Sequence, residues 1–103
     1  MVQVTFGRSV NPLFLSLNGH ANHGTGEFDM VCAAVTSAVR LFECVASDVA
    51  KSGAQVKIGQ SGQISITVEN PGATVCDMFL GFERLMLEYQ KEYPKHVAVG
   101  YVD

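Results

Sequence analysis

Residues 19–35 read GHANHGTGEFDMVCAAV, a loop with three glycines that runs directly into an apolar helix. Two segments before it, 1–6 and 13–17, alternate apolar and polar residues, which is typical of half-buried strands. A turn is expected between them at 8–12, where Ser, Asn and Pro gather. The chain is therefore predicted to pass from two strands through the glycine loop into its first helix.

The first helix is predicted to begin at Asp29 or just before it, because aspartate is a favoured N-cap. Gly53 is expected to end it as a C′ glycine. The stripe predicted to bury against a sheet should be centred near Val31, Ala38 and Phe42. Its members recur at helical spacing: Val31, Ala34, Val35, Ala38, Leu41, Phe42, Val45 and Val49.

The second half of the chain is also expected to contain two strands and a helix, followed by a last strand. Strands are expected at 55–59 and 63–68 around the turn Gly59–Gly62, then a helix at 73–93 and a last strand at 97–102. The order β-β-α-β-β-α-β indicates an α/β fold with two layers, one mixed β-sheet and two helices packed on it. Residues 1–103 are expected to form a single domain.

The second helix carries a wider apolar arc than one sheet can cover. Cys76, Leu80 and Leu87 lie beside its main stripe and widen the arc to roughly 220°, against ~100° for an ordinary surface helix. We expect this flank to pack against a second copy of the chain. The main stripe consists of Val75, Met78, Phe79, Phe82, Met86, Tyr89 and Tyr93.

Composition excludes several classes of protein. The net charge is −3, with 48% apolar and 17% charged residues, which is typical of a globular domain without a basic surface for nucleic acid. Lys and Arg form no run that suggests a membrane surface, and no apolar run is expected to reach the ~20 residues of a membrane span. No secretory signal is visible, so the three cysteines should be reduced thiols in the cytoplasm.

Cys32 and His20 are the candidate reactive pair. Cys32 is expected in the first turn of the helix and about 120° from the centre of the buried stripe, where unpaired N–H groups and the helix dipole favour a thiolate. The same N–H groups can bind an oxyanion. Gly19, Gly24 and Gly26 let the chain fold back, so that His20 can approach and take the thiol proton.

Neighbouring residues leave alternatives open. His20, His23 and Cys32, with His96, could instead bind zinc, although their spacing matches no strong zinc pattern, so no metal or other cofactor is expected. Asp29 either orients the histidine or raises the pKa of the thiol. Thr36, one turn beyond the cysteine, either bonds within the site or bonds back to its own helix.

The segment Gly19–Ala21, GHA, followed by a glycine loop and DMVCAAV at 29–35, resembles the signature of the ribosomal-processing cysteine proteases called Prp. The family pattern is roughly G-H-A, a loop with glycines, then G-x-D-I-V-C-A-A-V-S. Met30 replaces the usual Ile, and Thr36 stands where the family often has Ser. The resemblance extends over the length of the chain.

The resemblance implies a homodimeric Cys–His endopeptidase. Such an enzyme removes a short N-terminal extension from a bacterial large-subunit ribosomal protein and cleaves after an aromatic residue. By this resemblance Cys32 is the nucleophile, His20 the base and Asp29 the acidic residue of the motif. The loop would order over the peptide, and its substrate-loop residues are Gly19, Asn22, Gly24 and Gly26. The alternative is a ribosome- or peptide-binding module of the same fold that does not hydrolyse.

Overall fold

The computed structural model describes residues 1–19, 26–59 and 62–103, with the backbone alone at 27–29. Its elements follow the predicted order β-β-α-β-β-α-β, with a π-helical turn added after the first helix. They are β1 (Val2–Val10), β2 (Leu13–Asn18), α1 (Glu27–Cys44), η1 (Val45–Val49), β3 (Gln55–Ile58), β4 (Ile64–Val68), α2 (Gly72–Glu92) and β5 (Val97–Val102).

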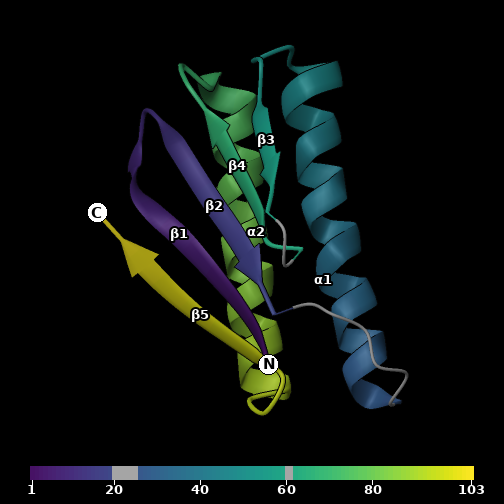
Figure 1. Ribbon diagram of the computed structural model, residues 1–103. Coiled ribbons are helices and arrows are strands. Elements are labelled where there is room, and N and C mark those ends of the chain that lie inside the picture. The colour runs from purple at the N-terminus through teal and green to yellow at the C-terminus, as the bar shows by residue number, and fades with distance from the viewer. Residues whose placement is uncertain (20–25, 60–61) are drawn as a thin grey trace.

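The strands form one mixed sheet in the order β3-β4-β2-β1-β5 (Figure 1). The two hairpins and the β2–β4 pair are antiparallel, whereas β5 returns parallel to β1 after α2. Phe6 on β1 lies between two paired strands, opposite Leu15 on β2 and opposite Tyr101 on β5. The predicted mixed sheet is confirmed.

Alternate residues of the strands form the core on one face of the sheet only. Val2, Val4 and Phe6 of β1 are buried, while Gln3 between them is exposed. Buried residues of both helices belong to the same apolar cluster, so α1 and α2 cover that face and leave the other uncovered (Figure 1). The fold is therefore the predicted two-layer α/β arrangement.

The first hairpin differs from prediction. β1 continues to Val10, and only residues 11–12 turn, because the register with β2 shifts between Phe6 and Val10 and absorbs the extra residues. The Asn11 side chain then links this turn to the one before α2. Its Nδ2 donates to Asn70 Oδ1 at 2.9 Å, and the Asn70 backbone N–H donates to Asn11 Oδ1 at 3.1 Å. Polar composition alone made 8–12 resemble a loop.

The buried stripe of α1 is rotated from the predicted one. Leu41 and Val49 were expected in the core but are exposed. The face of α1 that packs on the sheet is rotated about the helix axis from the predicted face. In the π-helical turn at Val45–Val49, the wider turn changes which residues point toward the sheet. The buried residues are Val31, Cys32, Val35, Val39 and Phe42 of α1 and Ala46 of η1.

The expectation that no apolar run reaches the length of a membrane span was wrong. Met30–Val49 is a 20-residue helical stretch with a hydropathy of 1.5, long and apolar enough to cross a membrane by length and composition. The core helix of a globular domain has the same properties, and this one contributes Val35, Val39 and Phe42 to the apolar cluster under the sheet. One third of the stretch is buried, and Met30, Leu41 and Val49 within it are exposed.

Candidate active site

Cys32 is the sixth residue of α1 and is only 1% exposed. Both expectations about its position were wrong, because it lies in the second turn and in the core rather than in the first turn and on a flank. The helix begins at Glu27, and Gly26, with φ 62°, is its N-cap. The first helical hydrogen bond is donated by the Met30 N–H to the Gly26 carbonyl at 3.2 Å.

This start changes where the helix can stabilise negative charge. The N–H groups without an acceptor inside the helix are those of residues 26–29, one turn before Cys32. Because the dipole effect falls off within the first turn, it favours a thiolate at Cys32 less than predicted. Asp29 is the third helical residue and not the N-cap, so its predicted capping role is also wrong.

The cysteines differ sharply in exposure. All three lie in the described part of the chain, and none forms a disulfide. Cys44 is exposed and Cys76 half-buried, whereas Cys32 packs among the apolar side chains of the core. Thr36, one turn further along α1, is half-buried. A peptide carbonyl therefore does not reach the Cys32 thiol from solvent in this conformation.

The predicted base lies outside the described residues, as do Asn22, His23 and Gly24. The approach of His20 to Cys32 therefore stays a prediction. Among the described side chains, which exclude those of 20–25, 27–29 and 60–61, no three from His, Cys, Asp or Glu come together as a metal site. The described borders of the loop are Gly19 and Gly26, and both have positive φ, at 79° and 62°.

The two border glycines differ in what a side chain would meet. A Cβ on Gly19 would overlap the Met1 carbonyl oxygen, whereas a Cβ on Gly26 would meet no atom of the described residues within 4 Å. We expect Gly26→Ala to lower the free energy of unfolding by about 1–3 kcal/mol, because φ 62° with ψ −114° is a sparsely populated conformation for an L residue. Gly19→Ala should lower it further, because the backbone must also shift. Urea denaturation measures both variants, and equal losses would contradict the steric argument.

A small apolar cavity adjoins the segment that carries Cys32. Met30, Val31 and Ala34 line it from the start of α1, and Tyr89 and Tyr93 line it from the end of α2. Both tyrosines were expected in the core stripe of the second helix, and their position beside a cavity was not predicted. Their position at the end of α2 could have indicated that they lie beside the start of α1, because in antiparallel neighbouring helices the end of one lies next to the start of the other.

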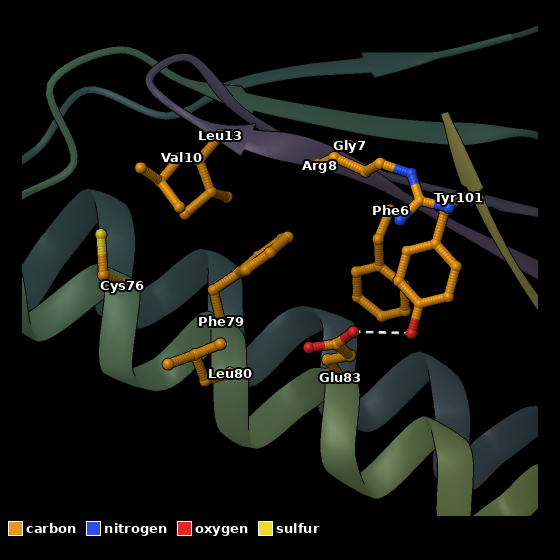
Figure 2. Close-up of a pocket in the computed structure, with 10 residues that line it drawn as sticks. All are labelled: Phe6, Gly7, Arg8, Val10, Leu13, Cys76, Phe79, Leu80, Glu83 and Tyr101. Atoms are coloured by element: carbon orange, nitrogen blue, oxygen red, sulfur yellow. Dashed lines mark hydrogen bonds between the residues drawn. The ribbon is translucent and has the colours of Figure 1, made fainter. Parts of the chain in front are cut away.

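A larger cavity of about 280 Å³ lies on the opposite flank of α2 (Figure 2). Phe6 and Phe79 line it, and the Tyr101 hydroxyl donates to Glu83 Oε2 at 2.6 Å beside it. This hydrogen bond raises the pKa of Tyr101 above its ordinary value of 10.0, because the carboxylate favours the protonated phenol. Cys32 does not line this cavity, so it is not part of the site around the predicted nucleophile.

Comparisons with known proteins agree with the fold and with the motif. The model of the family described as cysteine protease Prp matches residues 1–98. The solved structure of SMU.848 from Streptococcus mutans is 25% identical, with a TM-score of 0.86 over 99% of this chain and 97% of that chain. No curated protein matches this chain.

Two further solved structures share the fold at lower identity. One is an essential ribosomal processing protease Prp from S. aureus in complex with a substrate peptide, and the other is that protease with a covalently linked product peptide. Each is 15% identical and covers 99% of this chain and 100% of its own, with TM-scores of 0.86 and 0.83. Because the family model spans nearly the whole chain, the chain belongs to the Prp family of cysteine proteases and is a cysteine protease.

Proposed function

We propose that this protease removes the short N-terminal extension of a bacterial large-subunit ribosomal protein, cleaving after an aromatic residue, with Cys32 as nucleophile and His20 as base. The observation that carries the proposal is the family match over residues 1–98, which spans both residues. The S. aureus protein of the same fold is a ribosomal processing protease that binds a substrate peptide. Such a substrate implies work in the cytoplasm, where ribosomes assemble.

The proposed reaction is a two-step acyl transfer. His20 takes the Cys32 thiol proton, and the thiolate attacks the scissile carbonyl carbon. Backbone N–H groups of residues 26–29 are the nearest helix-start donors for the oxyanion. The C–N bond then breaks, the leaving amine takes the proton from His20, and a thioester remains. Water hydrolyses the thioester and regenerates the thiol.

Burial of the thiol adds one requirement to this reaction. With Cys32 only 1% exposed, its surroundings must rearrange before a peptide carbonyl comes within bonding distance. Catalytic contacts are often incomplete in a protease without its substrate and form only in the complex. Peptide binding and exposure of the thiol are therefore expected to be coupled.

Incubation with a synthetic peptide matching the extension of the host's ribosomal protein tests the proposed function. We expect one cut after an aromatic residue, identified from the masses of both products, and no cut in a scrambled peptide of the same composition. Binding of the peptide without a cut would support the non-hydrolytic module instead. Neither cutting nor binding would contradict both functions.

We further propose that the protease is a homodimer. Leu80 on α2 is 59% exposed, and across the cavity of Figure 2 Val10 is also exposed. Half-buried Cys76 lines the same cavity. Clustered exposed apolar side chains beside a cavity are typical of a surface that a partner covers. A second copy of the chain would cover these exposed apolar side chains, so no other partner protein is required.

Sedimentation velocity at micromolar concentration checks the dimer. We expect the wild type to sediment as a dimer and Leu80→Glu to sediment as a monomer, because a carboxylate in an apolar interface is desolvated without a partner. Leu41→Glu is the matched control, since Leu41 is 56% exposed but lies on α1. A monomeric wild type refutes the dimer, and dissociation by Leu41→Glu alone places the interface elsewhere.

A further inference from the structure

The two edges of the sheet differ in how their backbone N–H groups are used. On β5, the Val97 N–H donates to the Tyr93 carbonyl oxygen at 3.0 Å, and the Val99 N–H donates to Gln90 Oε1 at 2.7 Å. On β3, the strand at the other edge, the N–H groups that point away from the sheet have no acceptor among the described residues. The end of α2 therefore covers the β5 edge, whereas the β3 edge, Gln55–Ile58, is open.

The residues of β3 that point outward are Val56 and Ile58. In an antiparallel pair, residues bonded to the partner strand alternate with residues whose N–H and C=O point away from it. The Gly59 N–H donates to the Gln63 carbonyl oxygen at 2.7 Å, and the register continues from there into β3 and β4. Alternation from this bond directs the backbone groups of Val56 and Ile58 away from β4. Each of the two residues offers one donor and one acceptor to an added strand.

The open edge is apolar on the side of the helices. Val56 lies opposite Ile66, which belongs to the core, so Val56 and Ile58 face the helix layer. Val56 is half-buried, but Ile58 is 73% exposed. An open edge is a template for another strand, which proteins use to bind extended peptides. The edge therefore offers both main-chain hydrogen bonds and an exposed apolar side chain.

Cys32 lies on the flank of α1 that faces the β3 side of the sheet. α2 contacts β1 and β5, so α1, its neighbour on the same face, lies on the side of β3 (Figure 1). Ala34 of α1 lines a cavity with Tyr89 and Tyr93 of α2, so Ala34 marks the flank that faces α2. Cys32 is two residues before Ala34, which at ~100° per residue places it about 160° away around the helix axis. The thiol therefore projects away from α2 and toward the side of β3.

The open edge also ends level with the start of the glycine loop. Ile58 pairs with Ile64, and Ile64 pairs with Leu17, two residues before Gly19. Because neighbouring strands are about 4.8 Å apart, Ile58 lies about 10 Å from Leu17 along this row. β3 and β2 run in the same direction, since both are antiparallel to β4. A peptide that continues past Ile58 therefore runs toward the loop and the start of α1, where Cys32 lies.

We propose that the open edge of β3 binds the substrate peptide as an added strand, through main-chain hydrogen bonds to Val56 and Ile58, and that the peptide continues from there past Cys32. The inference rests on the proposed function, because it takes Cys32 as the nucleophile. The occupant is an extended peptide, since the chain is a cysteine protease and a peptide main chain complements the unpaired groups of the edge. Every second side chain of the peptide lies on the same side as Ile58 and covers it.

A scan of the extension peptide with single N-methyl groups tests the added strand. Kd is measured by fluorescence anisotropy with Cys32→Ala, which binds without cleaving. A methyl group on an amide that bonds to β3 removes the donor, so we expect Kd to rise roughly 10-fold at every second amide of one short stretch. Methylation of the amides between them should change Kd little. A scan without this two-residue alternation overturns the proposal.

A proline in β3 tests the same contact from the side of the protein. Ile58→Pro removes an outward N–H but no hydrogen bond between β3 and β4, and proline is tolerated at such edge positions. Ile58→Ala is the matched control, because it also truncates the side chain but keeps the N–H. We expect Ile58→Pro, combined with Cys32→Ala, to bind the peptide roughly 10-fold more weakly than Ile58→Ala in the same background. Equal Kd values for two variants that melt at similar temperatures overturn the proposal.

Cleavage by the protein with Cys32 intact separates failure of the added strand from failure of the proteolytic function. Alternating sensitivity in the binding scan without any cleavage supports the added strand and contradicts the proteolytic function. Cleavage at the same rate for every N-methylated peptide supports the proteolytic function and overturns the added strand. An absence of binding to Cys32→Ala also overturns it.

Discussion

We expect Cys32→Ala to lower kcat for the extension peptide by at least about a thousandfold, which corresponds to roughly 4 kcal/mol of transition-state stabilisation. The reason is that the covalent thioester path needs the sulfur, and alanine leaves only binding and positioning. Cleavage is measured by product masses over a time course. Cys44→Ala is the control, since Cys44 is exposed and far along α1, and it should retain the wild-type rate.

The partnership with His20 is checked by combining substitutions. His20→Ala should lower kcat nearly as much as Cys32→Ala does. The double variant should be no slower than either single variant, because the effects of residues that act as a unit are not additive. A His20→Ala variant that keeps the wild-type rate would remove His20 from the mechanism. Thermal melts of each variant exclude unfolding as the cause, which matters because Cys32 lies in the core.

We expect Phe6→Ala to lower the free energy of unfolding by about 3–5 kcal/mol, a large part of the 5–15 kcal/mol of a typical domain. Phe6 is almost completely buried, and its ring centroid lies 5.4 Å from Phe79, 5.7 Å from Phe82 and 5.9 Å from Tyr101. Truncation leaves a cavity between sheet and α2 and removes these ring contacts together. Urea denaturation followed by circular dichroism measures the change.

Phe14→Ala is the matched control for Phe6→Ala. Phe14 is also a strand phenylalanine, but it is half-buried and lies on the sheet face that the helices do not cover. Truncating Phe14 should lower the free energy of unfolding by only about 1 kcal/mol, because less apolar area returns to water and no enclosed cavity forms. Equal losses for the two variants would mean that the aromatic cluster under the sheet does not dominate stability.

Local patterning predicted the elements well where a single face is buried. The alternation of Val2, Val4 and Phe6 predicted β1, and the last strand was predicted at its observed bounds, Val97–Val102. Periodicity predicts strands here because each strand of a two-layer fold has one solvent-exposed face and one buried face. It was less accurate at 8–12, where pairing with β2 overrides a polar, turn-like composition.

Local patterning was wrong about the surroundings of Cys32. Its neighbours are apolar on several sides of the helix, so the sequence was compatible with more than one rotation of α1 against the sheet. Val39 and Cys32 became buried because the sheet faces that side. Leu41, apolar as well, faces away from the core. The start of α1 at Glu27 likewise follows from the bend at Gly26 and not from Asp29.

The sequence by itself determined the order of elements, the two-layer class and the family, because alternation, helical spacing and the GHA and DMVCAAV segments are properties of neighbouring residues. Only the tertiary structure decided that β5 pairs in parallel with β1, that the Cys32 thiol is buried, and that Tyr89 and Tyr93 meet the start of α1. These facts depend on contacts between segments far apart in the chain. Burial is a property of the packed layers, which no local pattern encodes.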